Sequence, residues 1–368
     1  MQKKLIALAI AGLVSAPAFA QSNVTIYGVA DAYVGFGKHG ENDFRGVGGG
    51  GLSGSRVGFR GAEDLGNGLK AVFVLEQGFN IDNGVEMGSG YQRQALVGLN
   101  GAFGTVALGR QYAPGYFFNH DGLAGAAVGP QSILSAYAGM SITPNSGARW
   151  NNSVTYTGSF SGLTARAIYS AGNIENGNGY DSVGDKFAAP SSDDAYGLGL
   201  EYANGPLKVS GVYQVVKFVD TAITPNDGKK QKEWGIGAGY DFGVVALNAS
   251  YQSADNLGGW KDEDADLWTV GLGVPVGAAG NVHLSYAQVK FDIPGDSDTK
   301  IKSYTLAYTH ALSKRTTAYV AYNRTDNDKG EFAGLVPYSR KQSEAFLPTS
   351  DVGGKNADLL GVGIRHTF

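Results

Sequence analysis

The sequence predicts an all-β fold, a 16-stranded antiparallel transmembrane β-barrel, from three observations. Apolar and polar residues alternate over many segments of about ten residues, the pattern of strands with one apolar and one wet face. Short and long links alternate between these segments. The 368 residues include 57 Gly and 20 Tyr but no Cys, so the fold must close by hydrogen bonding and burial without disulfides.

The chain begins with the pattern of a secretory signal peptide. Lys3 and Lys4 precede an apolar run over Leu5–Val14, and Ala18 and Ala20 form an A-x-A cleavage pattern. The run is too short to cross a bilayer as a helix, which needs about 20 apolar residues. We expect cleavage to remove residues 1–20 and to leave one barrel domain over residues 21–368.

Three strands are expected near the start of this domain, with alternation over Val24–Phe36, Ser53–Ala62 and Leu69–Phe79. The link Glu63–Gly68 is a tight turn that ends in Asn-Gly, the strongest short hairpin signal. The Gly-rich link His39–Leu52 is polar and long, and we expect a loop there. Short and long links therefore follow each other from the beginning.

The same order continues to the end of the chain. Further short turns are expected at Asn100–Gly104, Gly158–Gly162, Ala203–Pro206, Asp241–Gly243, Gly277–Asn281 and Ala311–Arg315. Long loops are expected at Asn80–Gly90, Tyr112–Ala148, Asn173–Asp193, Asp220–Gln231, Asp255–Asp264, Asp292–Asp298 and Asp326–Asn356. The segments between them number about sixteen, each long enough to cross a bilayer as a tilted strand. Short periplasmic turns and long external loops are typical of a transmembrane barrel.

Several strands carry aliphatic side chains in the middle of one face and an aromatic ring near an end. Aromatic rings at strand ends are typical of the girdles that meet lipid headgroups. A soluble β-sandwich also alternates, but it needs about half as many strands and does not explain Arg, Lys and Glu on the polar face. The clearest faces are Trp234, Ile236, Ala238 and Tyr240; Val245, Leu247, Ala249 and Tyr251; Trp268, Val270, Leu272 and Val274; and Val282, Leu284 and Tyr286.

A barrel of about 16 strands leaves an aqueous channel, whereas about eight strands are filled by side chains. The stretch Tyr112–Ala148 interrupts the alternation with Gly, Pro and Ser. A loop of this length inside a compact fold is usually functional. We therefore predict that residues 113–148 form a constriction loop that folds into the barrel and narrows the pore.

Six stretches resemble the trimeric general porins of Gram-negative outer membranes, in the neisserial and Burkholderia-like β-proteobacterial branch. The resemblance implies a 16-stranded barrel in the cell outer membrane, a homotrimer and a third loop inside the lumen. It also implies that the terminal Phe368 is the assembly signal read by the barrel assembly machinery. The stretches are Val24–Asp31, Ser53–Leu75, Phe103–Gln111, Arg149–Tyr156, Leu312–Thr316 and Gly361–Phe368.

Selectivity is expected to depend on local charge. Loss of Lys3 and Lys4 lowers 29 basic residues to 27 against 33 acidic ones, so the formal net charge moves from -4 to -6. Most acids lie in expected external loops, however, and exposed charges are screened beyond about 8 to 10 Å. The third loop of the family often carries several acids, but Asp121 is the only carboxylate in Tyr112–Ala148. We predict weak anion selectivity.

Alternation assigns charged side chains to the lumen, because Arg on the lipid face costs about 2 to 4 kcal/mol at the midplane. Arginines facing Asp121 would create a transverse field at the narrowest point. A plainer interpretation is that these arginines pair with acids and only solvate the wall. The predicted constriction residues are Arg56, Arg60, Arg93, Arg110, Asp121 and Arg149, and the predicted wall residues are Asp31, Lys70, Glu76, Arg166 and Glu201.

The sequence offers little for other function classes. The G-x-G-x-x-G match at Gly46, Gly48 and Gly51 lies in an expected loop, without the strand and helix that a dinucleotide site requires. The five His residues are scattered, no G-x-S-x-G elbow occurs, and basic residues are too dispersed for nucleic acid. We expect no enzyme, no metal and no cofactor.

The predicted function is passive diffusion of ions and small hydrophilic solutes through a trimeric outer-membrane channel. Lipid, lipopolysaccharide and the assembly machinery are the expected partners. The alternative is a substrate-specific channel for a sugar or small organic acid, and a barrel phospholipase is more distant. Aromatic residues of the third loop keep the specific channel open: Tyr112, Tyr116, Phe117, Phe118 and Tyr137.

Overall fold

The structure is a computed structural model, and it describes most of the chain outside the N-terminus and several loops. The expected signal peptide, residues 1–20, lies outside the described part. No helix within the described part is long and apolar enough to cross a membrane. The described residues are 23–39, 42–85, 90–123, 128–144, 148–172, 194–218, 227–295, 299–327 and 356–368.

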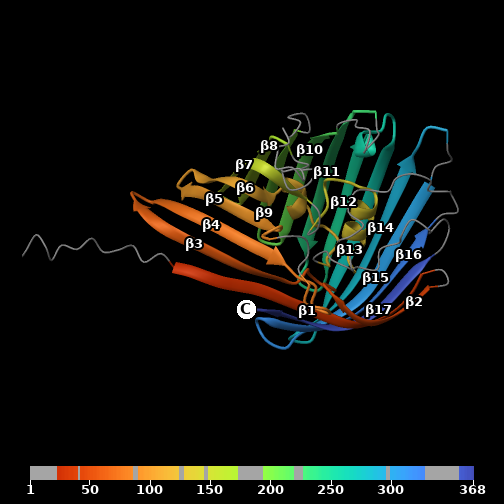
Figure 1. Cartoon of the computed structure of the whole chain (residues 1–368). Coiled ribbons are helices and arrows are strands. Elements are labelled where there is room, and N and C mark those ends of the chain that lie inside the picture. Colours follow the sequence, from red (N-terminus) through yellow and green to blue (C-terminus); the bar gives the residue numbers. More distant parts are fainter. Residues whose placement is uncertain are drawn as a thin grey trace, which may run out of the picture.

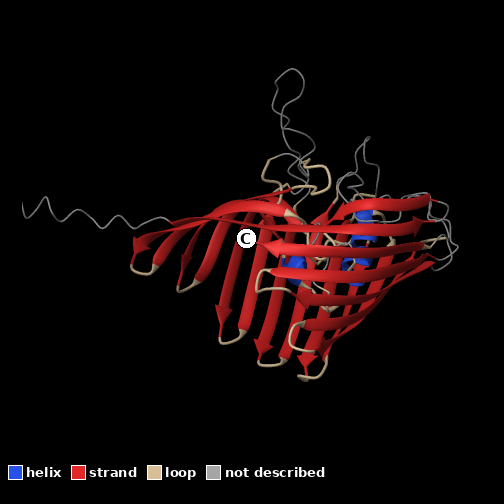
Figure 2. Ribbon diagram, turned by 90° about the horizontal axis from the view of Figure 1, so that it is seen from below, coloured by secondary structure: helices blue, strands red, loops and turns tan. Residues whose placement is uncertain are grey.

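Within the described residues, seventeen strands form one antiparallel sheet that closes on itself (Figures 1 and 2). Each strand from β3 to β16 pairs with the next strand in the sequence. The strands are β1 (Asn23–His39), β2 (Asn42–Gly49), β3 (Arg56–Gly66), β4 (Leu69–Gly78), β5 (Gln94–Gly101), β6 (Gly104–Tyr112), β7 (Arg149–Phe160), β8 (Leu163–Ser170), β9 (Ala195–Asn204), β10 (Leu207–Lys217), β11 (Lys230–Asp241), β12 (Ala246–Asp255), β13 (Asp264–Val276), β14 (Gly280–Asp292), β15 (Thr299–Ala311), β16 (Thr316–Asn327) and β17 (Ala357–Thr367).

Strand β1 closes the barrel by pairing along both of its edges. One edge pairs with β17, which lies beside β1 in Figure 1. The other edge pairs with β3 over Asn23–Val29 and with β2 over Ala32–His39. Strands β2 and β3 therefore share one position in the sheet, and the barrel has sixteen strand positions. The predicted 16-stranded antiparallel barrel is confirmed.

Strand β2 corrects the prediction of a loop over His39–Leu52. Its Gly-rich sequence indicated a loop because Gly usually weakens a strand. Here Gly48 is opposite Tyr33 of β1, and a Cβ atom at Gly48 would lie 2.6 Å from the Tyr33 ring. The glycine lets the tyrosine ring lie flat across the partner strand, so pairing continues through a stretch that looks irregular in the sequence.

The short connections agree with the predicted turns. Between β3 and β4, Asn67 and Gly68 both have positive φ, 53° and 76°, as a two-residue hairpin turn of the favoured twist requires. Because neighbouring strands are antiparallel, the predicted short turns all lie at one end of the barrel. At the other end the connection from β1 to β2 spans only residues 40–41, whereas the remaining connections are longer, and several of them are partly or wholly outside the described residues.

The end of the chain completes the pairing of β1. The backbone N–H of Gly28 donates to the Phe368 carbonyl at 3.0 Å, and the Phe368 N–H donates to the Gly28 carbonyl at 3.2 Å. A Cβ atom at Gly28 would lie 2.3 Å from the Phe368 ring, so glycine makes room for this ring. Closure thus uses the last residue of the chain, whose side chain faces outward with Leu360, Val362 and Ile364.

Asp31 stabilises the connection between the end of β2 and the start of β3. Its fully buried carboxylate accepts hydrogen bonds from the backbone N–H groups of Leu52 at 2.9 Å and Ser53 at 2.8 Å. The hydroxyl of Tyr319, on β16, donates to the same carboxylate at 2.7 Å. The sequence predicted that Asp31 lines the pore wall. The structure places it inward but uses it to join β1, the β2–β3 connection and β16.

We expect Asp31→Ala to destabilise the barrel by about 3 kcal/mol, since three buried donors lose their acceptor. The measurement is the urea midpoint of the refolded protein in micelles. The matched control is Asp241→Ala, which removes an exposed turn carboxylate that accepts one N–H, from Gly243, at 2.8 Å. Equal losses in the two variants would contradict the structural role of Asp31.

Candidate permeation pathway

The predicted constriction segment folds into the barrel and carries two short helices, as Figure 2 shows. The 3₁₀ helix η1 (Pro114–Phe117) contacts β8, β9 and β10. The α-helix α2 (Pro130–Tyr137) contacts β13, β14 and β15 and buries Ile133 and Leu134 against them. The sequence indicated only an irregular loop, although Pro130 at the first helical position is a start signal.

Polar residues on the inner face of the wall hold this segment. Both carboxylate oxygens of the buried Glu233 accept backbone N–H groups, from Ser141 at 2.5 Å and Ile142 at 2.8 Å. Gln214 accepts the N–H of Gly115 at 2.6 Å. Sequence reasoning missed both side chains. Both side chains occupy buried positions of the neighbouring strands β10 and β11, and this inward placement is the signal that could have indicated a buried partner.

The inner face of β3–β7 carries a group of residues that we call the Glu76 cluster. Its members are Arg56, Glu76, Arg93, Tyr112 and Arg149. The Nε atom of Arg93 lies 2.7 Å from Glu76 Oε1, and Arg56 Nε lies 3.5 Å from Glu76 Oε2. One buried carboxylate therefore pairs with two arginines.

Tyr112 connects the third arginine to this cluster. Its hydroxyl donates to Glu76 Oε1 at 2.8 Å and accepts from Arg93 at 3.0 Å. The guanidinium carbon of Arg149 lies 5.3 Å from the centre of the Tyr112 ring, a cation–π contact. Tyr116 of η1 stacks on Tyr112, with ring centres 3.7 Å apart. The cluster thus holds three guanidinium groups against one carboxylate.

Other predicted residues line the inner face around the cluster. Arg60 lies over the ring of Tyr27, 5.0 Å from its centre, and Arg166 lies over Phe117 at 4.3 Å. Glu201 forms an ion pair with Lys208 at 3.3 Å, near the short-turn end. By strand register, Lys70 shares the inward face of β4 with Glu76 and is exposed.

Arg110 lies on the other face of the wall. Register places it opposite Ala95 and on the same face as Val106 and Leu108, which are exposed on the outside of the barrel. Its guanidinium contacts the Gln92 carbonyl and the Asn151 side chain beside an irregularity in the β6–β7 pairing. The structure therefore does not bring Arg110 together with the Glu76 cluster, although Tyr112, two residues further along β6, joins that cluster beyond the irregularity.

Asp121 packs against the far side of the barrel. Its backbone carbonyl accepts the hydroxyl of Ser285 on β14 at 2.8 Å, and it lies against Gly271 on β13. In pairing order these strands are about half a barrel away from β3–β7. The side chain is fully buried, with Oδ1 accepting the N–H of Leu123 at 2.9 Å. Asp121 thus holds the loop's own turn and does not present its charge to solvent.

The described residues contain no group of His, Cys, Asp or Glu that could hold a metal ion. The inner face instead combines a fixed excess of guanidinium groups with a folded-in segment. This geometry defines a class of protein, the transmembrane β-barrel channel whose lumen is narrowed by its own loop.

The comparisons with known proteins agree with this class. Residues 7–330 match the Gram-negative porin family, and the chain belongs to this family. It is 34% identical to outer membrane porin protein 32 of Delftia acidovorans and 32% identical to an outer membrane porin of Bordetella pertussis, over the full length of each pair. The chain is an outer-membrane porin.

Solved structures support the fold. An anion-selective porin from Comamonas acidovorans superposes with a TM-score of 0.75 at 30% identity, over 95% of this chain and 100% of that one. The OmpF porin of Salmonella typhi superposes with a TM-score of 0.66 at 19% identity, over 94% of this chain and 98% of that one. The second likeness concerns the fold alone.

Burial raises the pKa of Asp121 from its ordinary value of 3.8 to about 7. Between about pH 4 and 7 the native state then holds a proton that the unfolded state releases, so this group lowers stability as the pH rises through that range. We expect Asp121→Asn to make the unfolding midpoint fall less steeply between pH 4 and 7 than it does in the wild type.

The measurement is the urea midpoint at half-unit pH steps in micelles. Asp241→Asn, in an exposed turn, is the control and should keep the wild-type slope. Other buried acids contribute to the wild-type slope, and the difference between the two proteins isolates Asp121. Identical slopes for wild type and Asp121→Asn would show that Asp121 does not hold this proton.

Proposed function

We propose that the protein is a weakly anion-selective diffusion channel whose preference is set by the Glu76 cluster. The observation that carries this proposal is the unequal pairing of charge: Arg56, Arg93 and Arg149 gather around the single carboxylate of Glu76. Arg60 and Arg166 add positive charge on the same wall. Asp121, the acid of the folded-in segment, is buried in its own turn.

The physical basis is that dissolved salt screens electrostatic interactions over short distances. Exposed charges are screened beyond about 8 to 10 Å, so an ion in the lumen responds to the nearby guanidinium groups more than to distant loop acids. Rings of Arg or Lys favour anions in pores. Fixed, partly paired arginines attract weakly, so a solute can leave as readily as it enters. The solved relative at 30% identity is described as an anion-selective porin, which supports the same sign.

A substrate-specific channel is the second candidate, and the aromatic residues of the segment do not favour it. Phe118 is buried against Ile142 and Val212, and Tyr137 packs on Phe291. These rings serve packing between segment and wall. An aromatic path for one sugar or acid requires successive exposed rings, and among the five loop aromatics only Phe117 is exposed, while the other four are buried or half-buried.

We expect Arg149→Ser and Arg56→Ser each to lower the chloride over potassium permeability ratio by about twofold, the effect of one screened charge a few ångströms from the ion path. The measurement is the reversal potential of single channels in a planar bilayer under a KCl gradient. Arg315→Ser removes an exposed charge in a short turn and is the control. An unchanged reversal potential in both cluster variants would remove the cluster from the selectivity filter.

A homotrimer is the proposed assembly, and the outer wall supports it. Tyr and Trp side chains face outward on many strands from β7 to β17, as expected where rings meet headgroups. Apart from Tyr112, whose side chain contacts the Glu76 cluster, the outward positions of β1–β6 by register hold no Tyr or Trp among the described residues. They carry small and aliphatic side chains such as Ala30, Val97 and Leu108. A face without interfacial rings is suited to contact another subunit.

We expect Val97→Lys to yield monomers and Ile236→Lys to leave trimers. Both residues are outward and similarly exposed, 58% and 59%, so the cost of a lysine in lipid is matched. Only Val97 lies on the proposed subunit face. The measurement is the mass of the refolded protein in detergent by light scattering. Trimers in both variants, or a monomeric wild type, would contradict the assignment of β1–β6.

Phe368 is proposed to serve as the signal read by the barrel assembly machinery. The Phe368 side chain remains 49% exposed at the outer wall, while its backbone pairs with Gly28. The assembly machinery could therefore contact this ring before the barrel closes. Deletion of this residue would remove both the ring and the final hydrogen bonds. Catalysis forms no part of the proposed function.

A further inference from the structure

Tyr116 of η1 links the folded-in segment to the Glu76 cluster. Its ring is nearly parallel to the ring of Tyr112, at the end of β6, with 15° between the ring planes and 3.7 Å between the ring centres. Tyr112 belongs to the cluster, whereas Tyr116 belongs to the segment. The stack is therefore a contact through which the docking of the segment can affect the arginines of the cluster.

The two faces of the Tyr112 ring have different neighbours. The ring of Tyr116, stacked at 3.7 Å, covers one face. The guanidinium carbon of Arg149 also lies over the Tyr112 ring, 5.3 Å from its centre, so it must use the opposite face. A cation in this position is attracted by the negative face of the ring. The Tyr112 ring thus lies between the Arg149 guanidinium and the Tyr116 ring.

Hydrogen bonds fix the hydroxyl of Tyr112 but leave its ring plane undetermined. The hydroxyl donates to Glu76 Oε1 at 2.8 Å and accepts from Arg93 at 3.0 Å. Rotation about the axis from Cβ to the hydroxyl turns the ring and leaves the oxygen in place, and tyrosine has a broad preference for this torsion. The stack with Tyr116 therefore determines where the ring faces point, and so where a cation can lie over them.

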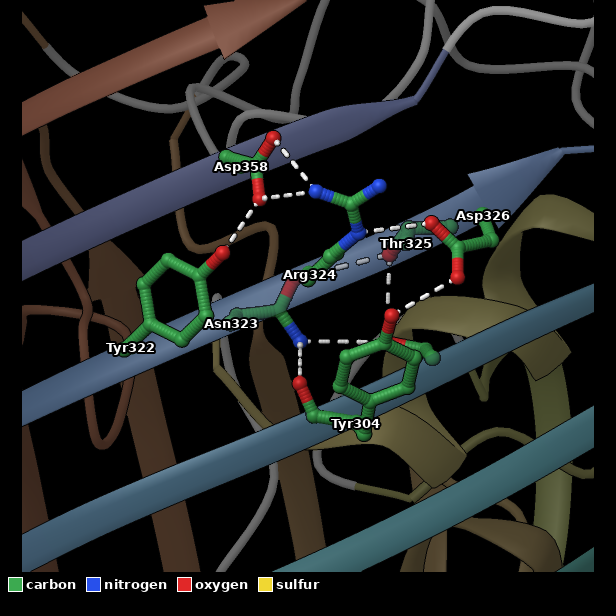
Figure 3. Close-up of polar contacts among 8 residues, drawn as sticks. Tyr304, Tyr322, Asn323, Arg324, Thr325, Asp326 and Asp358 are labelled. Atoms are coloured by element: carbon green, nitrogen blue, oxygen red, sulfur yellow. Dashed lines mark hydrogen bonds and ion pairs between the residues drawn. The ribbon is translucent and has the colours of Figure 1, made fainter.

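The outer wall shows a different way to position an arginine. Arg324 of β16 lies between two carboxylates in Figure 3, with its Nε atom 2.7 Å from Asp326 Oδ1 and a terminal nitrogen 3.3 Å from Asp358 Oδ1. The hydroxyls of Tyr304 and Tyr322 donate to the same two acids. This guanidinium is held by acids that cancel its charge, and the tyrosines contribute only their hydroxyls.

Arg149 has no acid of this kind. Among the described residues it forms no ion pair, and its buried Nε atom has no hydrogen-bond partner. Arg56 and Arg93, in contrast, both pair with Glu76. Of the three cluster arginines, Arg149 is therefore the one whose orientation depends most on an aromatic ring.

Contacts with the wall hold Tyr116 independently of the cluster. Its ring packs against a buried apolar group on β7, β8 and β10 that includes Trp150, Ile168 and Val216. It also meets the ring of Phe117 edge to face, with ring centres 5.2 Å apart and planes at 81°. The position of Tyr116 is therefore set by the docking of η1 on the wall, and its ring is a fixed support for Tyr112.

We propose that Tyr116 is a positioning residue for ion selectivity, which fixes the plane of the Tyr112 ring and thereby holds the Arg149 guanidinium at the ion path. The inference rests on the proposed function of the Glu76 cluster. Tyr116 carries no charge of its own and acts on the ion only through Arg149. The folded-in segment thus contributes to selectivity through an uncharged ring.

The test is the reversal potential of single channels under a KCl gradient. We expect Tyr116→Leu to lower the chloride over potassium permeability ratio by about twofold, as Arg149→Ser does, because the same charge leaves its place. Tyr116→Met, which fills the space without a flat face, should behave alike. Tyr116→Phe should keep the wild-type ratio, since the stack does not need the hydroxyl.

Tyr137→Leu is the matched control. Tyr137 is also a half-buried ring of the segment, but it packs on Phe291 of β14, away from the cluster. This variant should keep the wild-type permeability ratio. A lowered ratio in Tyr137→Leu equal to that in Tyr116→Leu would show that any loosening of the segment alters selectivity, and would overturn the specific role of Tyr116.

The double variant Tyr116→Leu/Arg149→Ser separates positioning from packing. If Tyr116 acts through Arg149, the double variant should have the ratio of Arg149→Ser alone, whereas a ring with only a packing role would lower the ratio further or leave it unchanged in both backgrounds. A wild-type ratio in Tyr116→Leu and Tyr116→Met, with a lowered ratio in Arg149→Ser, would overturn this inference and leave the proposed function standing. An unchanged ratio in Arg149→Ser would overturn the role of Arg149 in both.

Discussion

The whole structure depends on the need to satisfy backbone hydrogen bonds where no water is available. Within hydrocarbon, an unpaired strand edge costs several kcal/mol for each polar group, so a sheet must close. Closure here is made by β1, which pairs with β17 on one edge and with β2 and β3 on the other. The last residue, Phe368, extends this pairing to Gly28. Asp31 then secures the one break in the sheet, where β2 ends and β3 begins.

Closure divides every strand into a lipid face and an inner face, and the inner face has two tasks. On β10–β15 its polar residues hold the folded-in segment. Gln214 and Glu233 accept backbone N–H groups of the segment, and the Ser285 hydroxyl donates to a backbone carbonyl. On β3–β7 it carries the Glu76 cluster. The segment is therefore attached mainly to one half of the wall, while the Glu76 cluster lies on the other half.

Alternation along the strands was sufficient to predict the barrel, its turns and the inward positions of Arg56, Arg60 and Arg166. It was insufficient where tertiary contacts override the local pattern. The Gly-rich β2 is a strand because Tyr33 lies over Gly48. Helix α2 is stabilised by burial against β13–β15, which no local pattern encodes.

The strand pattern also failed to predict the positions of two charged residues. Arg110 follows the outward residues of β6, yet a sequence match and a positive charge led to its assignment to the lumen. Asp121 has the right charge in the right segment, but its own turn and the wall enclose it. Whether a carboxylate points to water or to a backbone N–H depends on the path of the loop. The residue type and the strand period do not contain this information.

The Glu76 cluster shows how positive charge can be concentrated without losing order. Three guanidinium groups without a counter-charge would repel one another, whereas an acid for each would cancel the field. Glu76 pairs with Arg56 and Arg93 and so fixes two of them with a single negative charge. Arg149 lies instead over the ring of Tyr112, a contact that orients a guanidinium without neutralising it. Because Tyr112 also hydrogen-bonds to Glu76, all three arginines are positioned by one connected network that carries a net positive charge.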